Sequence, residues 1–334
     1  MIAGLLVVAA AAIMSAGLIV LLHPLLVRYA LARPNARSSH KVPTPQGGGV
    51  AVVISVLLVT GVTFALLGVR ALPLVEIATV FSAVALVTFV GAVDDIRTIE
   101  VAPRLLLQAV AVAAVIAAIP HDATVIPFLP WWIERTLLLV GGIWFLNLVN
   151  FMDGIDWMTV AEILPVSAGL VILGFLGALP SYGIVAALAL FGAMLGFAPF
   201  NRPVARLFLG DVGSLPLGLL IGWLLLLVAA RGHLAAALLL PLYYLADATV
   251  TLIRRLLRGE RVWQAHRTHF YQRATDNGHS VQAVVAGVLL INVALVGLAI
   301  LTVVTASWTL SSAALVIGAL VVGLFLAWLN RGAK

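Results

Sequence analysis

The chain has 334 residues, of which 63% are hydrophobic, 10% are charged and none is cysteine, and its formal net charge is +6. Soluble domains are about half apolar and about a quarter charged, so this composition excludes an ordinary soluble protein. It also excludes disulfides. Because the positive charge lies in short loops, it indicates membrane topology and contact with anionic lipid, and not a nucleic-acid partner.

Apolar stretches long enough to cross a bilayer recur along the whole chain. A transmembrane helix needs about 20 consecutive apolar residues, and on this basis the sequence predicts an all-α bundle of about 11 transmembrane helices. The predicted spans lie near residues 2–22, 48–67, 74–93, 103–119, 134–150, 158–176, 181–199, 212–230, 234–253, 280–303 and 309–329. We expect residues 1–334 to form a single integral-membrane domain whose first span is retained and not cleaved as a signal peptide.

Basic residues are distributed unevenly between the two sets of predicted loops. Most of the 19 Lys and Arg residues fall in alternate loops and the C-terminal tail, whereas the other loops hold only Arg70, Arg135 and Arg231. Cytoplasmic loops carry an excess of Lys and Arg, so the sequence predicts an N-terminus outside and a C-terminus inside. The longest predicted cytoplasmic loop, residues 254–280, is strongly basic and contains histidines.

Two adjacent carboxylates, Asp94 and Asp95, end the apolar run 74–93. Two charges about 4 Å apart repel by roughly 4 kcal/mol at an effective dielectric constant near 20, and nearby hydrocarbon adds to the cost of ionised Asp. Mg²⁺ would relieve this repulsion, because it binds through one or two carboxylates together with substrate phosphates. The alternative is a solvated helix end at which Arg97 is the partner.

Polar residues recur at every third position from residue 147 to residue 156. If this stretch is helical, Asn147, Asn150, Asp153 and Asp156 share one face, drifting slowly around it. The amides suit a base or a sugar amide because they both donate and accept hydrogen bonds, and the acids suit hydroxyl groups or a metal ion. The alternative is a structural role in capping or in helix–helix hydrogen bonding.

Two other stretches favour phosphate binding. Residues 37–49 combine prolines and three consecutive glycines with Lys41, whose charge could neutralise a phosphate while the glycines let the backbone approach a ligand. Asp211 precedes the predicted span 212–230, where free backbone N–H groups also suit phosphate. The alternatives are a basic topology loop for the first stretch and an ordinary helix cap for the second.

The last predicted cytoplasmic loop carries His266, Arg267 and His269. Zinc is one interpretation of the two histidines, but no thiolate or third ligand lies nearby in the sequence. Contact with phosphate or sugar is favoured, and a lipid-facing basic helix is the alternative. Asp247, inside a predicted span, is expected to partner Arg254 or Arg255 and not to take part directly in catalysis.

All of these motifs fall on one predicted face of the membrane. Asp at the bilayer centre would cost about 3 kcal/mol per residue, a cost that largely disappears at the cytoplasmic interface. The sequence therefore predicts an acidic, Mg²⁺-binding cleft that faces the cytosol and suits a nucleotide-activated group and a lipid-borne phosphate. A transporter is a remote alternative, because transporters place such groups near the midplane and often contain inverted repeats. A non-catalytic scaffold would not need the carboxylates.

As a set, the motifs resemble those of the polyprenyl-phosphate N-acetylhexosamine-1-phosphate transferases, which include the phospho-MurNAc-pentapeptide transferases. The matching pieces, in family order, are residues 41–49, 93–95, 147–156 and 210–213, followed by His266 and His269. The resemblance implies transfer of a sugar-1-phosphate from a UDP-sugar to undecaprenyl phosphate, with release of UMP, at the cytoplasmic face of a bacterial inner membrane. It implies Mg²⁺, with Mn²⁺ as a substitute, and leaves a homodimer open.

The resemblance also implies roles for particular residues. Asp211 is expected to be the main metal ligand, with Asp94 and Asp153 as further ligands. Asp94 is also expected to orient or deprotonate the lipid phosphate, with Asp95 supporting it. The expected substrate-binding residues are Lys41, Asn147, Asn150, Asp153, Asp156, His266, Arg267 and His269.

The sequence departs from the pentapeptide-transferase pattern at two places. Trp157 and Met158 follow Asp156 where many relatives have Gly-Leu, and Phe270 replaces a further histidine of the pentapeptide enzymes. The histidine loop is more similar to that of the O-antigen and GlcNAc-type branch. We therefore expect a UDP-N-acetylhexosamine donor, with UDP-MurNAc-pentapeptide as the alternative.

Overall fold

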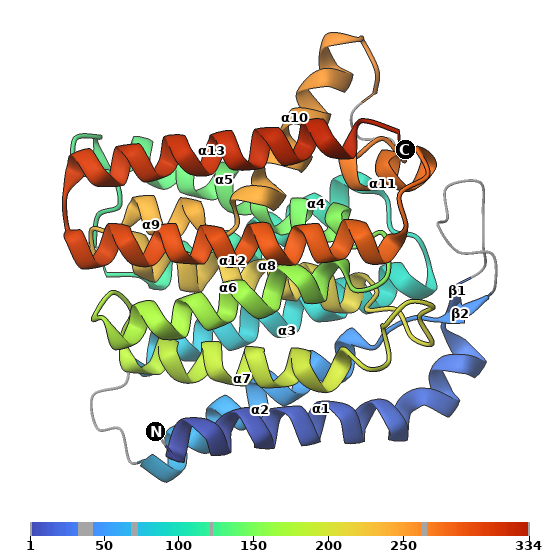
Figure 1. The fold of residues 1–334 in the computed structure, drawn as a ribbon. Helices are drawn as coiled ribbons and strands as arrows, with labels where there is room; N and C mark the ends of the chain where they lie inside the picture. The colour runs from blue at the N-terminus through green and yellow to red at the C-terminus, as the bar shows by residue number, and fades with distance from the viewer. Residues whose placement is uncertain (1, 33–42, 68–72, 121–122, 262–265, 333–334) are drawn as a thin grey trace.

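In this computed structural model, the described residues are 2–32, 43–67, 73–120, 123–261 and 266–332, and nearly all of them are helical (Figure 1). The helices are α1 (Ile2–Tyr29), α2 (Gly49–Leu67), α3 (Leu74–Ile96), α4 (Val101–Ala118), α5 (Trp131–Met152), α6 (Met158–Phe175), α7 (Ser181–Phe197), α8 (Asp211–Ala229), α9 (Leu234–Leu239), α10 (Leu242–Leu257), α11 (Phe270–Asp276), α12 (Val281–Thr305) and α13 (Trp308–Leu329). Two short strands, β1 (Leu31–Ala32) and β2 (Thr44–Pro45), pair antiparallel. Figure 1 shows the N-terminus at one end of the bundle and the C-terminus at the other.

Within these ranges, nine helices are long and apolar enough to cross a membrane, and α7, with 17 residues, is a shorter apolar helix. The prediction of a multi-pass, all-helical membrane protein is therefore confirmed. The predicted number of spans, about 11, and the orientation of the bundle stay predictions.

The predicted span 234–253 is not a single helix. It forms α9 and most of α10, which are separated by Leu240 and Pro241. Proline has no backbone N–H and its ring clashes with the preceding helical turn, so it tends to end one helix and begin another. The later part of α10 extends beyond α13 at the top of Figure 1.

Helix α8 is the most enclosed of the membrane-length helices, and it packs against α2, α3, α5 and α9. After Asp211 it contains no charged residue, and its apolar residues surround the whole helix, the pattern of a helix that is buried all round. The first turn of α8 therefore has a fixed place within the bundle.

Gly91 allows α3 to contact the beginning of α8. A Cβ atom at this position would overlap with the main chain at Asp211, so a larger residue requires the two helices to separate. Asp94 and Asp95 follow one turn later on α3. The close contact at Gly91 therefore brings both carboxylates beside Asp211.

We expect Gly91→Ala to push α3 away from α8 and to lower the free energy of unfolding by about 1–3 kcal/mol, the usual effect of overpacking. Thermal unfolding of the purified protein in detergent measures this change. Gly17→Ala in α1 is the control, because its Cβ would meet nothing within 4 Å. A Gly91→Ala protein that unfolds like the control would contradict the close contact.

Candidate active site

Three carboxylates meet where α3 ends and α8 begins, and we call Asp94, Asp95 and Asp211 the acidic cluster. Asp95 accepts the backbone N–H of Asp211 at 3.0 Å and that of Val212 at 3.1 Å. These contacts satisfy two N–H groups that a helix start leaves free, and a negative charge is favourable there. Asp95 therefore positions Asp211. Its predicted support of Asp94 stays a prediction.

Asp94 lies against Asp211 and accepts hydrogen bonds from a separate set of donors. Its carboxylate accepts the backbone N–H of Ile99 and the Arg104 guanidinium, each at 2.6 Å. It also interacts with the Asp211 carboxyl group. Arg104 Nη1 is 3.9 Å from Asp211 Oδ2, so this arginine lies near both carboxylates.

Sequence reasoning used Arg104 only as evidence of topology and missed its place in the site. The signal that could have revealed it is its position at the start of α4, where the helix dipole disfavours a cation. A basic residue in the first turn of an apolar helix suggests a nearby acid. The structure supplies that acid as Asp94, in place of the partnership with Arg97 that was the alternative for the Asp94–Asp95 pair.

The polar residues near the end of α5 do not share one helical face. Helix α5 ends at Met152, so Asp153 and Asp156 lie beyond it, next to Gly154, a poor helix former. Asn150 donates to Asp211 Oδ1 at 2.8 Å and to Ser214 at 2.9 Å, so it orients the Asp211 carboxylate.

Asn147 faces a different neighbour, since it donates to Gln108 on α4 at 2.7 Å. Asp156 is buried and accepts the backbone N–H of Ala205 at 2.9 Å. In the structure these two side chains therefore make the helix–helix and loop contacts of the structural alternative. Their predicted contacts with substrate stay predictions.

Asp153 accepts a hydrogen bond from the Thr159 hydroxyl. Burial and the charges of Asp95 and Asp156, against the opposing effect of the Thr159 hydrogen bond, raise the pKa of the Asp153 carboxyl group to about 6. This carboxyl group is therefore ionised at neutral pH and becomes protonated as the pH falls through about 6.

The three predicted metal ligands, Asp94, Asp153 and Asp211, do not form one cluster. In the part of the chain that the structure describes, no group of three or more His, Cys, Asp or Glu side chains is arranged to hold a metal ion. Asp94 and Asp211 alone still fit Mg²⁺, because this ion commonly takes one or two carboxylates and completes its shell with substrate phosphates and water. The two adjacent carboxyl groups form a site that attracts a cation, and in this structure the Arg104 side chain lies beside both of them.

The glycine-rich stretch contacts the chain itself. The N–H groups of Gly48 and Gly49 donate to the carbonyl groups of Phe208 and Leu209, each at 2.9 Å. Gly49 also lies directly against Gly213 on α8, where any larger residue would overlap. These glycines therefore serve close packing at the helix start. Lys41, the predicted phosphate ligand of this stretch, lies outside the described residues.

The histidine loop folds back against the bundle through Asp247. This buried carboxylate accepts the backbone N–H groups of Phe270 at 3.0 Å and Tyr271 at 3.2 Å, and lies 3.3 Å from His269 Nδ1. Asp247 thus caps the start of α11, and its predicted partnership with Arg254 or Arg255 stays a prediction. The sequence could not reveal this fold-back of α11 onto α10.

His266 and His269 lie together, with ring centroids 4.8 Å apart. His269 is buried and stacks against Phe151 at the end of α5, while His266 is half-buried. Arg267 forms an ion pair of 3.0 Å with Asp276 at the far end of α11. The more accessible of the two histidines, His266, is therefore the better placed to meet a ligand.

The pKa of His266 gives a test of this arrangement. Burial, together with electrostatic interaction with His269 and Arg255, lowers the pKa of His266 to about 4. We expect the His266 ring to stay neutral until the pH falls to about 4, which NMR titration of a ring-labelled protein would show. Because the unfolded chain binds this proton near pH 6.5, stability should decrease as the pH falls below about 6.5.

His266→Gln should weaken that dependence of thermal stability on pH, since glutamine does not titrate. His23→Gln is the control, because His23 lies in α1, far along the chain from the loop. A His266 ring that titrates near pH 6.5 would show that the histidine pair is open to water.

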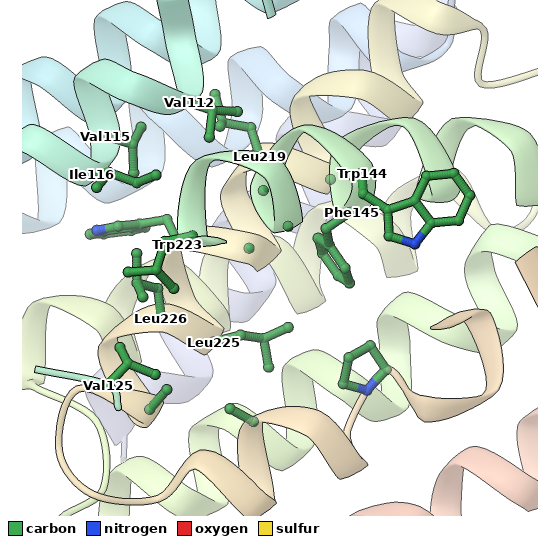
Figure 2. Close-up of a pocket in the computed structure, with 18 of the residues that line it drawn as sticks. Val112, Val115, Ile116, Val125, Trp144, Phe145, Leu219, Trp223, Leu225 and Leu226 are labelled. Carbon is green, nitrogen blue, oxygen red and sulfur yellow. The ribbon is translucent and has the colours of Figure 1, made fainter. Parts of the chain in front are cut away.

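An apolar cavity of about 290 Å³ lies between α4, α5, α8, α9 and α10. Figure 2 shows Val112 and Ile116 of α4, Phe145 of α5, and Leu219 and Trp223 of α8 around it. At a rise of about 1.5 Å per residue, Leu219 lies about 12 Å along α8 from Asp211. The cavity is therefore separate from the acidic cluster and runs along the same helices.

Membrane-length helices with carboxylates at one end indicate a membrane protein with an acidic site, and comparison with known proteins supports a transferase. A model of glycosyl transferase family 4 matches residues 77–229, a range that includes the acidic cluster and the stretch 147–156. The predicted resemblance is thereby confirmed: the chain is related to the polyprenyl-phosphate N-acetylhexosamine-1-phosphate transferases.

Three relatives illustrate this relationship. The chain is 26% identical to a probable undecaprenyl-phosphate N-acetylglucosaminyl 1-phosphate transferase of Bacillus subtilis, over 75% of this chain and 71% of that protein. It is 28% identical to a decaprenyl-phosphate N-acetylglucosaminephosphotransferase of Mycolicibacterium smegmatis, over 75% and 70%. It is 27% identical to a phospho-N-acetylmuramoyl-pentapeptide-transferase of Carboxydothermus hydrogenoformans, over 70% and 78%.

Proposed function

We propose that the protein transfers an N-acetylhexosamine-1-phosphate from a UDP-sugar to a polyprenyl phosphate and releases UMP. An oxygen of the lipid phosphate attacks the phosphorus next to the sugar, and the bond to the UMP oxygen breaks. The observation that carries this proposal is the convergence of Asp94, Asp211, Asn150 and Arg104 from four helices. Phosphoryl transfer needs positioning and charge neutralisation, and this set of groups suits both.

Asp211 is positioned through both its side chain and its backbone. Asn150 holds one of its oxygens, and Asp95 holds its backbone N–H. Mg²⁺ bound beside Asp94 and Asp211 would neutralise charge on the diphosphate and on the departing UMP. Asp94, which already accepts hydrogen bonds from Ile99 and Arg104, is better suited to orient the lipid phosphate than to take a proton from it.

The apolar cavity offers a place for part of the prenyl chain. It is lined almost wholly by aliphatic and aromatic side chains, and it follows α5 and α8 away from the acidic cluster. A lipid bound there would present its phosphate toward Asp94 while its hydrocarbon stays out of water, which stabilises binding by about 25 cal/mol for each Å² of apolar surface buried.

The proposed donor is a UDP-N-acetylhexosamine, and UDP-MurNAc-pentapeptide is the second candidate. The names of the Bacillus and Mycolicibacterium relatives support the UDP-N-acetylhexosamine donor, and the name of the Carboxydothermus relative supports the UDP-MurNAc-pentapeptide donor. In the structure Phe270 packs under the Arg254 guanidinium, 4.9 Å from ring centroid to Cζ. Phe270 is buried, so its ring packs inside the protein and replaces the polar contact that a histidine at this position could make.

One assay tests the proposed reaction. Purified protein is incubated with a polyprenyl phosphate, Mg²⁺ and each of a panel of UDP-sugars, and the released UMP is measured. We expect UMP release with UDP-GlcNAc or a closely related N-acetylhexosamine donor, and none when the lipid or Mg²⁺ is omitted. Efficient use of UDP-MurNAc-pentapeptide would overturn the donor assignment, and UMP release from no donor would overturn the proposed function.

We also propose that the acidic cluster faces the cytoplasm of a bacterial cell, where UDP-sugars are made. Thr268 is exposed in the histidine loop, and the chain has no native cysteine. We expect Thr268→Cys to react with a membrane-impermeant maleimide in inside-out vesicles and not in intact cells. Ser307→Cys, between α12 and α13 at the other end of the bundle, is the matched control and should show the reverse pattern.

A further inference from the structure

Arg104 occupies the position where a cation would neutralise the acidic cluster. Its Nη1 lies 2.6 Å from Asp94 Oδ2 and 3.9 Å from Asp211 Oδ2. These are the two carboxylates that best fit a divalent ion, so the guanidinium group and the ion would be drawn to the same oxygens. Two such cations at this separation would repel one another strongly in a partly buried site.

Arg104 also has unused hydrogen-bonding capacity. Among the described residues, its buried Nε atom has no hydrogen-bond partner. Gln108, one turn further along the same face of α4, is fully buried and its Nε2 atom likewise has no partner within those residues. A buried N–H group without an acceptor is destabilising, so the α4 face favours a ligand that brings acceptor oxygens.

We propose that Arg104 is an internal counter-ion that a divalent cation displaces from Asp94 and Asp211, and that the freed guanidinium then binds phosphate oxygens of the substrate. This inference rests on the proposed function. The planar guanidinium can grip a phosphate through two N–H groups, which a lysine at this position could not do. The phosphate is that of the nucleotide diphosphate or that of the prenyl phosphate, since both carry the same acceptor chemistry.

The first half of the proposal is tested with Mn²⁺ as the probe and no nucleotide present. Because Arg104→Gln removes the competing cation, it should bind Mn²⁺ about tenfold more tightly than the wild type, as measured by electron paramagnetic resonance. Its metal-free form should unfold at a lower temperature, and Mn²⁺ should restore that temperature. Arg97→Gln, which removes an exposed arginine from the connection between α3 and α4, should bind Mn²⁺ within twofold of the wild type.

The second half is tested with saturating Mn²⁺. Arg104→Gln should then bind at least one of UDP-GlcNAc and a short-chain polyprenyl phosphate about tenfold more weakly, and the ligand affected identifies the phosphate that Arg104 contacts. Arg104→Lys keeps the positive charge but lacks the planar guanidinium group with its paired N–H donors. Arg104→Lys should bind Mn²⁺ as tightly as the wild type does. It should bind the phosphate ligand that is affected in Arg104→Gln about threefold more weakly than the wild type does.

Unchanged or weaker Mn²⁺ binding by Arg104→Gln would overturn the counter-ion role. If Arg104→Gln binds both phosphate ligands as the wild type does, the proposal that the freed guanidinium group binds substrate phosphate is overturned. If Arg104→Gln fails to fold, Arg104→Lys decides the matter, and phosphate binding equal to that of the wild type overturns the proposal. A wild-type protein that binds Mn²⁺ but no UDP-sugar would refute the proposed function while the Mn²⁺ titrations still decide the counter-ion role.

Discussion

Asp211→Asn should lower turnover by about 10²-fold or more, which corresponds to a loss of a few kcal/mol of transition-state stabilisation. The substitution keeps the shape of the side chain and removes the charge that the proposed metal site requires. The backbone N–H of residue 211 would still donate to Asp95, so α8 should begin at the same place. UMP release under saturating substrates measures the effect, and immunoblotting of membranes measures the amount of protein.

Glu100→Gln is the matched control for Asp211→Asn. Glu100 is an exposed acid just before α4, close in sequence to Arg104, and its side chain does not cap the helix. It should retain nearly full turnover. A folded Asp211→Asn enzyme with near-normal UMP release would rule out Asp211 as the main metal ligand.

Asp94→Asn should lower turnover strongly, by about 10²-fold, while changing the affinity for the UDP-sugar by less than about threefold. The proposed role of Asp94 is to orient the lipid phosphate, so its loss should affect the reaction more than donor binding. Turnover is measured as UMP release, and donor binding is measured by calorimetry in the presence of Mg²⁺.

The comparison of turnover with donor binding separates two roles of Asp94. If calorimetry shows that Asp94→Asn no longer binds the UDP-sugar, then Asp94 acts mainly in donor binding, directly or through the metal ion that it would share with Asp211, and orienting the lipid phosphate is not its main role. Glu100→Gln again serves as the control and should preserve both quantities. Arg104 loses its closest acceptor in Asp94→Asn, so a moderate decrease in thermal stability should accompany the change.

The helices could be predicted from sequence because length and apolar character are local properties. Ten of the predicted spans correspond to single helices, and the remaining one is broken at Pro241, where a local signal for the break was present. The meeting of Asp94, Asp95 and Asp211 was expected only in general terms, from their place at helix ends. Which atoms each carboxylate contacts depends on how α3 and α8 pack; Asp95, for example, contacts the backbone of α8.

Side-chain partners that are distant in the chain could not be predicted. Asp247 caps a helix that begins 23 residues later, and Asp95 caps one that begins 116 residues later. Asn147 and Asn150 look equivalent in the sequence, yet one contacts Gln108 on α4 and the other contacts Asp211 on α8. A repeat of three positions gives the approximate side of a helix, but the neighbour on that side is set by the tertiary fold.

The capping of α8 by Asp95 has a consequence for how the protein is made. The two carboxylates on α3 are synthesised and inserted long before Asp211, because 116 residues separate Asp95 from its backbone partner. Until α8 emerges from the ribosome and enters the membrane, Asp95 lacks the backbone N–H groups that order it, whereas Asp94 can already contact Ile99 and Arg104. A nascent chain halted after α7 would therefore hold two carboxylates at a membrane helix end without Asp211, and the acidic cluster would form only when α8 packs against α3.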